Sequence, residues 1–328
     1  NLCKYFPVRR GVFARVRNWV KAVDDVSFTV ERGETLGLVG ESGCGKTTLG
    51  RALLRLTPLS SGSIRVGGVR VDDLSESDFR PYRRRLQMVF QDPTSTLDPR
   101  WRVGESIGEA LDIHGLAASA ADRRDRIARL LDSVGLPADS ALRHPHEFSG
   151  GQRQRIGIAR ALVVQPKLVI ADEPVSALDV SIQAQILNLL KDLQESQELT
   201  YLFVSHNMAV IRYISDRIAV MYAGKLVELG PKQTLLNRPQ HPYTELLLAA
   251  VPRTIDRHQR TITAGEPPDL ARLPSGCVFR TRCKYAQARC AEEEPQLQEL
   301  DSGHFVSCHF AADLSLEGVV PRVHSFAA

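Results

Sequence analysis

The chain has 328 residues, of which 43% are hydrophobic and 24% charged, a composition close to that of globular proteins and far from disordered or fibrous chains. Its net charge is only +4, and its basic clusters at 83–85 and 123–129 are interleaved with acids or spaced as on helices. We interpret them as solvated faces and expect no nucleic-acid partner. No apolar window reaches the roughly 18 to 20 residues of a membrane span.

Short β-rich segments alternate with longer helical ones, which is typical of a parallel sheet covered by crossover helices, so the predicted fold class is α/β. A half-exposed strand is expected over Val26–Val30, followed by a turn and a buried strand over Thr35–Val39. A helix should begin near Thr48. From Asp92 onward helical periodicity replaces the β pattern, which predicts an inserted helical subdomain at about 92–158.

The second half of the chain repeats the strand and helix pattern before it changes character. Buried strands are expected over Leu168–Ala171 and Tyr201–Val204, with a helix over Val180–Gln197 between them. Past residue 230 the sequence becomes a proline-punctuated tail with few strand signals. We therefore predict two domains, residues 1–232 and 233–328.

Residues 40–47 read Gly-Glu-Ser-Gly-Cys-Gly-Lys-Thr, which fits the phosphate-loop pattern G-x-x-x-x-G-K-[ST] between a buried strand and a helix. Small residues let backbone N–H groups close around phosphate oxygens, and the helix N-terminus adds its positive dipole end. Lys46 would bridge the β and γ phosphates of ATP, and Thr47 would ligate Mg²⁺. The alternative is an ordinary glycine turn. The expected nucleotide-binding residues here are Gly40, Ser42, Gly43, Cys44, Gly45, Lys46, Thr47 and Thr48.

The strand over Leu168–Ala171 ends in the adjacent carboxylates Asp172 and Glu173. Its alignment with the strand before the phosphate loop should bring these groups to the same edge of the sheet. Asp172 would hold Mg²⁺, and Glu173 would orient and polarise the water that attacks the γ phosphate. Alone, such a strand end could equally be a helix cap; after a phosphate loop it indicates catalysis.

Residues 148–153, Phe-Ser-Gly-Gly-Gln-Arg, resemble the signature motif of ABC transporter nucleotide-binding domains. Ser149, Gly150, Gly151 and Gln152 would open a helix and form a second phosphate-binding N-terminus. In that family ATP lies between the phosphate loop of one subunit and the signature of another. The resemblance therefore implies a second ABC ATPase subunit or domain as partner.

Other positions match the same family in order and spacing. The resemblance implies that Gln91 senses Mg²⁺ and the membrane partner, that Asp179 supports the opposing site, and that His206 bonds to the γ phosphate. Val175 and Asn207 stand where Thr and Asp are usual, and neither change removes a group with a catalytic role.

The family also stacks the adenine of ATP on an aromatic residue near the start of the domain. The segment Lys4-Tyr5-Phe6 offers Phe6 as the first candidate and Tyr5 as the second. A core aromatic residue without contact to the nucleotide is the alternative for this position.

Residues 240–244, Gln-His-Pro-Tyr-Thr, and 265–268, Gly-Glu-Pro-Pro, resemble the carboxy-terminal extension of dipeptide and oligopeptide importer ATPases. This implies ATP hydrolysis coupled to peptide uptake at the cytoplasmic face of a bacterial inner membrane. The implied partners are two multi-span permeases and an extracytoplasmic peptide-binding protein. Related systems carry nickel or glutathione. A soluble ABC ATPase would add a coiled-coil insertion or a second motif set, and an exporter half would add membrane spans; the sequence has neither.

Four of the six cysteines lie in the tail, at Cys277, Cys283, Cys290 and Cys308, spaced C-x5-C, C-x6-C and C-x17-C. This spacing fits neither a zinc ribbon nor a ferredoxin run, so a metal site and unrelated buried thiols both remain open. The family resemblance implies a [4Fe-4S] cluster, with Zn²⁺ as the alternative, acting as a structural staple. Because the two sites share no ligand, we expect ATP affinity not to depend on these cysteines.

Overall fold

The computed structural model describes residues 1–10, 15–250 and 265–319. The chain divides into two compact units. The first unit comprises residues 1–29, 36–72 and 205–328, and the second comprises residues 30–35 and 73–204.

The first unit is built on a sheet whose strands follow the order β11-β12-β10-β9-β3. β3 pairs in parallel with β9, with Val39 opposite Val220, whereas β9, β10, β12 and β11 pair antiparallel. All five residues of β3 are buried, as its uniformly apolar sequence predicts. The bounds are β3 Thr35–Val39, β9 Arg217–Tyr222, β10 Lys225–Pro231, β11 Gln298–Asp301 and β12 His304–Val306.

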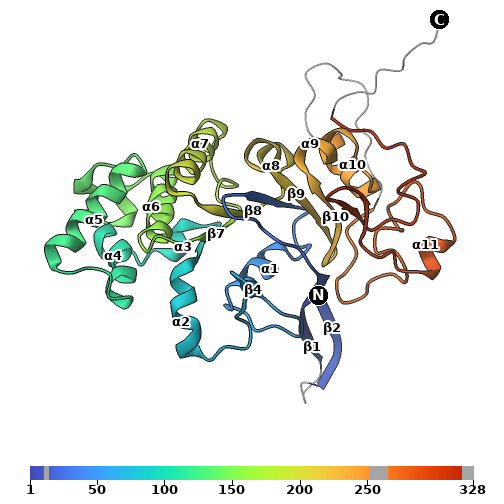
Figure 1. The fold of residues 1–328 in the computed structure, drawn as a ribbon, viewed down its shortest axis with the longest axis horizontal. Coiled ribbons are helices and arrows are strands. Elements are labelled where there is room, and N and C mark those ends of the chain that lie inside the picture. The colour runs from blue at the N-terminus through green and yellow to red at the C-terminus, as the bar shows by residue number, and fades with distance from the viewer. Residues whose placement is uncertain (11–14, 251–264, 320–328) are drawn as a thin grey trace, which may run out of the picture. The chain divides into compact units, whose positions relative to one another are not determined.

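The residues of the first unit that the structure describes form five helices. α9 packs against β9 and β10, and α10 follows it directly in the chain (Figure 1). α1 begins at Lys46, two residues before the predicted start, because the phosphate loop itself leads into its first turn. The bounds are α1 Lys46–Leu53, α8 Met208–Ile214, α9 Lys232–Asn237, α10 Pro242–Ala249 and α11 Arg289–Glu292.

A long hairpin precedes the phosphate loop in the first unit. Its strands are β1, Leu2–Arg10, and β2, Arg15–Val26, paired antiparallel. The prediction of a strand over Val26–Val30 is wrong: the ladder ends where Leu2 pairs with Val26, directly after Asp25 takes a left-handed conformation (φ 57°), and residues 27–30 form no strand. A two-stranded sheet, β4 Arg65–Val66 and β5 Val69–Arg70, lies after α1.

The second unit contains three parallel strands in the order β6-β7-β8, with Asp172 at the end of β7 opposite Val204 in β8. Both predicted strands are confirmed within one residue at each end. The bounds are β6 Leu86–Val89, β7 Leu168–Asp172 and β8 Thr200–Ser205.

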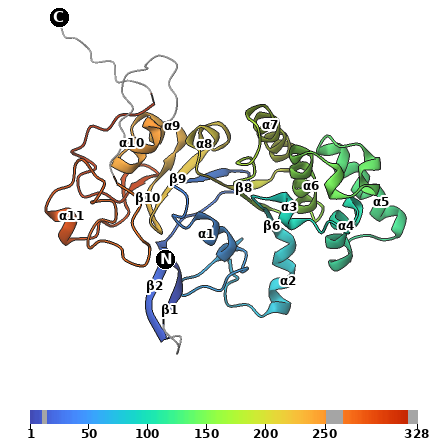
Figure 2. The ribbon, with the colours of Figure 1, turned by 180° about the vertical axis from the view of Figure 1, so that it is seen from behind.

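Helices make up the rest of the second unit, and α4, α5 and α6 pack against one another (Figure 2). α7 has the predicted bounds. Between β6 and β7 the chain forms only helices, turns and loops. The bounds are α2 Glu76–Arg85, α3 Pro93–Thr96, α4 Val103–Ile113, α5 Ala120–Ser133, the 3₁₀ helices Ala138–Leu142 and Pro145–Glu147, α6 Gly150–Leu162 and α7 Val180–Gln197.

Across the described ranges, we find no helix that combines the length and the apolar character needed to cross a bilayer.

Candidate functional site

Two glycines of the phosphate loop, Gly40 and Gly45, occupy positions that leave no room for a side chain. Gly45 is left-handed (φ 109°), and a Cβ there would lie 1.9 Å from the carbonyl oxygen of Ala22. A Cβ at Gly40 would lie 2.1 Å from the carbonyl oxygen of Met221. Neighbouring strands thus approach the loop closely enough to fix its shape, and only glycine fits.

The lysine of the loop is turned back across it. Lys46 is only 4% exposed, and its Nζ donates to the carbonyl oxygens of Gly40 at 2.7 Å and Glu41 at 2.9 Å. Burial raises the pKa of the Cys44 thiol, which Lys46 opposes from 3.8 Å. The Lys46 ammonium is thus held against the phosphate loop by two backbone carbonyl oxygens, and a cation at such a loop is suited to binding phosphate oxygens.

The remaining predicted residues of this loop lie where the chain turns into α1. Ser42 and Gly43 are exposed, with Gly43 also left-handed at φ 79°. Thr47 and Thr48 are half-buried in the first turn of the helix. The loop therefore presents its N–H groups at the positive end of the helix.

Glu41, the second residue of the loop, is held by two side chains that the sequence analysis did not connect with the loop. Its N–H donates to the Tyr243 hydroxyl at 2.8 Å, and its carboxylate accepts two hydrogen bonds from Arg282 at 2.6 and 2.9 Å. Arg282 lies 241 residues further along the chain. No motif pairs these positions, so only the fold could find them.

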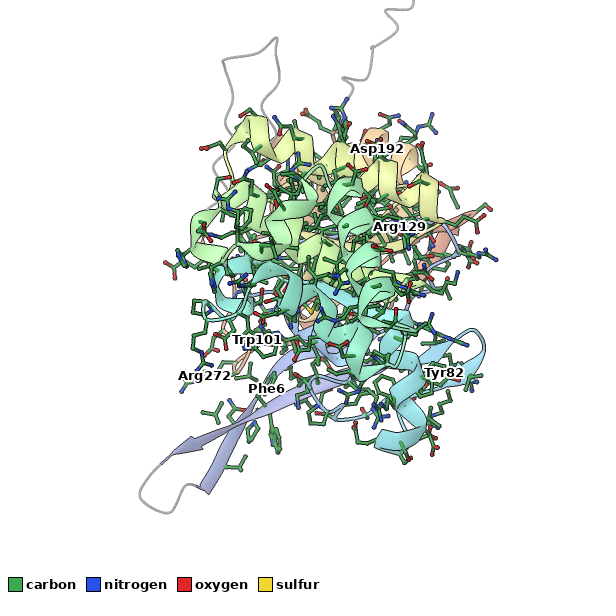
Figure 3. The ribbon with its side chains drawn as sticks, turned by 90° about the vertical axis from the view of Figure 1, so that its left-hand side faces the viewer. Phe6, Tyr82, Trp101, Arg129, Asp192 and Arg272 are labelled. Atoms are coloured by element: carbon green, nitrogen blue, oxygen red, sulfur yellow. The ribbon has the colours of Figure 1, made fainter. Side chains whose placement is uncertain are left out.

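The aromatic candidates for adenine lie on β1 and differ in their surroundings. The Tyr5 hydroxyl donates to Asp24, and burial followed by this bond raises the pKa of Tyr5 above its ordinary value. Phe6 is 39% exposed, with the Lys4 ammonium 4.6 Å from its ring centroid (Figure 3). Only Phe6 offers a ring with an open surface. His206, also in the first unit, is exposed just after β8.

In the second unit the structure brings together two of the predicted catalytic groups. Gln91 follows β6 and Glu173 follows β7, and Gln91 Nε2 donates to Glu173 Oε2 at 3.2 Å. Glu173 is left-handed (φ 47°), with its N–H bonded to the carbonyl oxygen of Val204 at 2.9 Å. Asp172, at the end of β7, is 2% exposed.

The predicted signature residues begin α6. Ser149 caps the helix: its Oγ accepts from Gln152 N at 3.4 Å, and Gln152 Oε1 accepts from Ser149 N at 2.9 Å. This reciprocal capping box occupies the N–H groups of both residues. Ser149 and Gly150 are exposed, Gly151 is half-buried, and Asp179 is the N-cap residue of α7.

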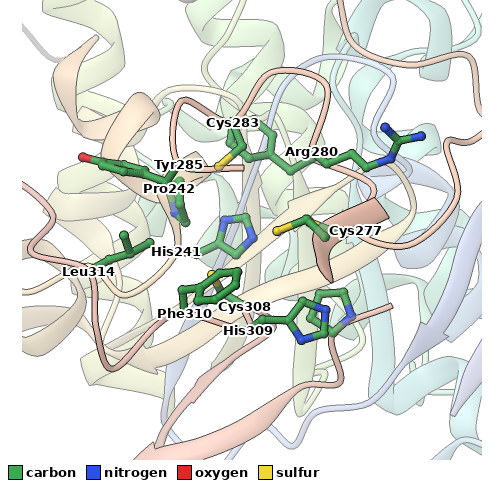
Figure 4. A pocket seen from close by; sticks show the side chains of 13 residues that line it. His241, Pro242, Cys277, Arg280, Cys283, Tyr285, Cys308, His309, Phe310 and Leu314 are labelled. Atoms are coloured by element: carbon green, nitrogen blue, oxygen red, sulfur yellow. The ribbon is translucent and has the colours of Figure 1, made fainter. Parts of the chain in front are cut away.

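All four tail cysteines line one pocket, together with His241 and Phe279. In Figure 4 the thiols of Cys277, Cys283 and Cys308 point toward a common space beside the His241 ring. Burial raises the pKa of Cys277 and of Cys308 to about 11 and also raises that of Cys283. His241 was missed as a pocket residue; burial lowers its pKa to about 3, so it is neutral at physiological pH.

The arrangement of these side chains does not form a ready-made ion site. Within the described part of the chain, no group of three or more His, Cys, Asp or Glu side chains is placed so that it could hold a metal ion. Cys3 and Cys44 lie elsewhere, on β1 and in the phosphate loop. The pocket contains the four tail cysteines, but their side chains are not arranged around a single ion.

Comparisons with known proteins agree with this geometry. Family models match residues 23–176 as "ABC transporter" and residues 227–290 as "Oligopeptide/dipeptide transporter, C-terminal region". The oligopeptide transport ATP-binding protein AppF of Bacillus subtilis is 51% identical, over 93% of this chain and 94% of its own length. The putative oligopeptide transport ATP-binding protein YkfD of the same organism is 51% identical, over 88% of this chain and 89% of its own.

A solved structure gives the same result for the fold. The dimeric ATP-binding cassette MJ0796, bound to ADP and Pi, is 29% identical with a TM-score of 0.63, covering 71% of this chain and 97% of its own. The α/β fold predicted from the sequence is thus that of ABC ATPases. With a phosphate loop, a capped signature helix and a matching C-terminal region, the chain belongs to the family of ATP-hydrolysing subunits of oligopeptide and dipeptide ABC transporters.

Proposed function

We propose that this chain hydrolyses ATP at a composite dimer interface to drive uptake of dipeptides and oligopeptides through partner permeases. The cargo class is supported by the match of residues 227–290 to the oligopeptide/dipeptide transporter region. ATP hydrolysis is supported by the phosphate loop, in which Lys46 Nζ donates to the carbonyl oxygen of Gly40. The domain organisation that we propose is a nucleotide-binding domain at 1–232, with a helical subdomain at about 92–158, and an extension at 233–328.

Each residue of the nucleotide site has a proposed role. Phe6 stacks on adenine, the loop residues from Gly40 to Thr48 bind the phosphates, and Lys46 bridges the β and γ phosphates. Thr47, Gln91 and Asp172 hold Mg²⁺, whose charge would stabilise the developing phosphate oxyanions when bound.

The chemical step is the attack of water on the γ phosphate. Glu173 orients this water by accepting a hydrogen bond from one of its O–H groups, while Gln91, bonded to Glu173 at 3.2 Å, keeps the carboxylate in position. His206 donates to a γ-phosphate oxygen. The leaving group is ADP, and the products are ADP and inorganic phosphate.

A second ABC ATPase subunit or domain completes the site. Ser149, Gly150, Gly151 and Gln152 form the N-terminus of α6, where the capping box uses the N–H groups of Ser149 and Gln152. The N–H groups of Gly150 and Gly151 and the positive end of the helix dipole suit the γ phosphate of a nucleotide bound on the partner's phosphate loop. Asp179 would support the opposing site. Hydrolysis then depends on closure of the dimer.

The membrane partners are two multi-span permeases, fed by an extracytoplasmic peptide-binding protein. The chain would bind peripherally at the cytoplasmic face of the bacterial inner membrane. The absence of a spanning helix among the described residues is consistent with a peripheral subunit.

For the cysteine pocket, we propose a [4Fe-4S] cluster, with Zn²⁺ as the alternative. Four thiols in one pocket are the donor set that such a cluster needs, and thiolates are its usual ligands. A single zinc ion would require all four sulfurs to converge on one point, whereas cluster thiolates bind separate irons. The cluster would supply a cross-link that orders a segment with little regular structure.

Reconstitution tests the function. The chain, two permeases and the second ATPase, assembled in proteoliposomes with a binding protein, should take up labelled peptides only when ATP is present. Variant complexes carrying Lys46→Ala should bind the same partners without uptake. ATP-dependent accumulation of nickel but not of peptide would assign a different cargo and reject the proposal.

A further inference from the structure

The C-terminal part of the chain holds the phosphate loop through Glu41. The Tyr243 hydroxyl accepts the Glu41 N–H at 2.8 Å. Arg282 donates from Nη1 to Glu41 Oε2 at 2.6 Å and from Nη2 to Glu41 Oε1 at 2.9 Å. Backbone and side chain of one loop residue are therefore both fixed by residues some 200 positions later.

The ion pair between Arg282 and Glu41 is largely buried and bidentate. The Arg282 side chain is 6% exposed and that of Glu41 is 29% exposed, so the pair is largely withdrawn from the solvent that weakens surface pairs. Bidentate guanidinium–carboxylate contacts fix orientation as well as distance. Arg282 also donates to the Tyr222 hydroxyl at 3.4 Å, and its pKa is raised, chiefly by its bonds to Glu41.

Arg282 belongs to the cysteine-rich segment, by which we mean residues 277–308 with the four pocket cysteines. It directly precedes Cys283, and it follows Phe279, which lines the same pocket as the four thiols. The Phe279 ring lies 5.1 Å from Tyr222 in an edge-to-face contact and 5.4 Å from Tyr243. Residues 277–283 thus carry two of the pocket thiols and the arginine that binds Glu41.

The position of Glu41 bears on the lysine that binds phosphate. Lys46 Nζ donates to the Glu41 carbonyl oxygen at 2.9 Å, so a shift of Glu41 displaces an anchor of the ammonium. We propose that Arg282 is a positioning residue, through which the cysteine-rich segment sets the shape of the phosphate loop and hence its affinity for ATP. The proposal relies on ATP binding by this chain and on the four-cysteine site, whichever metal that site holds.

Arg289 provides a matched control. Like Arg282, it directly precedes a pocket cysteine, Cys290, and forms an ion pair with a glutamate, Glu293, at 2.9 Å. Both partners are more than half exposed and neither belongs to the phosphate loop. Arg282→Ala should raise the Kd for ATP about five-fold or more, equivalent to about 1 kcal/mol, whereas Arg289→Ala should leave it unchanged.

The measurements distinguish a specific effect of Arg282 on the phosphate loop from a general loss of stability of the chain. Equilibrium binding of ATP, KM, kcat and the melting temperature are determined on the full chain. Arg282→Ala should raise KM more than it lowers kcat, and Arg282→Lys should recover part of the affinity by restoring the charge. In a double-mutant cycle with Glu41→Ala, the two effects should be strongly non-additive. Wild-type affinity in Arg282→Ala, equal weakening in Arg289→Ala, or additive effects would each overturn the proposal.

The link to the cysteines is tested by Cys283→Ser, with metal content measured in the same samples. The Kd for ATP should rise, and adding Arg282→Ala should raise it little further. Loss of metal with unchanged ATP affinity would overturn the link. Absence of iron from the wild-type chain would reject the [4Fe-4S] cluster while leaving the Arg282–Glu41 result to stand on its own.

Discussion

Gln91 and Glu173 follow neighbouring parallel strands, β6 and β7, and meet in a hydrogen bond of 3.2 Å from the amide nitrogen to the carboxylate oxygen. Two groups that the sequence separates by 82 residues are thereby joined at the ends of adjacent strands. The bond from Gln91 therefore orients the carboxylate of Glu173.

Glu173→Gln should reduce ATP turnover at least about 100-fold, because the amide keeps the shape of the side chain but loses the charge that polarises water. ATP binding should survive. The measurement compares kcat and the Kd for ATP in the assembled transporter. Glu195→Gln, an exposed substitution on α7, serves as control, and near-normal hydrolysis by the Glu173 variant would remove this residue from its role.

Phe6→Ala should weaken ATP binding about five-fold or more, since stacking of a base on an aromatic ring contributes about 1 kcal/mol or more. Phe6→Trp should preserve affinity. Trp19→Ala is the matched control: Trp19 is an exposed aromatic residue of the same hairpin, paired with Pro7, so it faces the opposite side of the ribbon from Phe6. Equal loss of affinity in both alanine variants would argue against stacking at Phe6.

The composite site predicts complementation between two inactive variants. Lys46→Ala removes the phosphate-loop ammonium, and Ser149→Arg obstructs the signature helix. Each homogeneous preparation should be inactive. A mixture should regain part of the activity, because one kind of mixed dimer site pairs an intact loop with an intact signature. Hydrolysis by the wild-type chain should also rise more steeply than linearly with concentration. A mixture that stays inactive, or a rate strictly proportional to concentration, would contradict the composite site.

The permease should contact residues 91–103, between β6 and α4. Before α4 begins at Val103, this segment has only four residues of regular helix, those of α3, and its Trp101 is 39% exposed (Figure 3). A photo-crosslinking residue at Trp101 should capture a permease in the assembled complex. The same photo-crosslinking residue at Asp192, an exposed position on α7, should not capture a permease. Capture at position 192 alone would move the contact away from this segment.

Whether a structural feature could be predicted from the sequence depends on how far apart in the chain the residues that form it lie. Local patterns correctly predicted strands β3, β7 and β8 and helix α7. The strands are buried on both faces, which leaves a continuous hydrophobic pattern. The predicted strand at Val26–Val30 failed because alternation alone does not supply a pairing partner. The family resemblance predicts Gln91 and Glu173 as parts of one site, and the two side chains are hydrogen-bonded in the structure.

The contacts around Glu41 could not be predicted in this way. Arg282 and Tyr243 carry no motif that points to the phosphate loop, and their bonds to it arise from long-range packing of the cysteine-rich segment. The expectation that ATP affinity is independent of the cysteines considered only shared ligands. In the structure Arg282, which directly precedes Cys283, is hydrogen-bonded to Glu41 of the phosphate loop. This contact connects the two sites without any shared ligand.

The cysteine pocket predicts a coloured protein. If Cys277, Cys283, Cys290 and Cys308 bind a [4Fe-4S] cluster, chain purified without oxygen should be brown and contain about four irons, because thiolate-to-iron transitions absorb visible light. Serine at any one of the four should bleach the colour. Serine at Cys3 or Cys44, which lie outside the pocket, should not. One zinc and no iron would keep the four-thiolate site but replace its metal. No metal in anaerobically prepared protein would leave four pocket thiols that serve only packing.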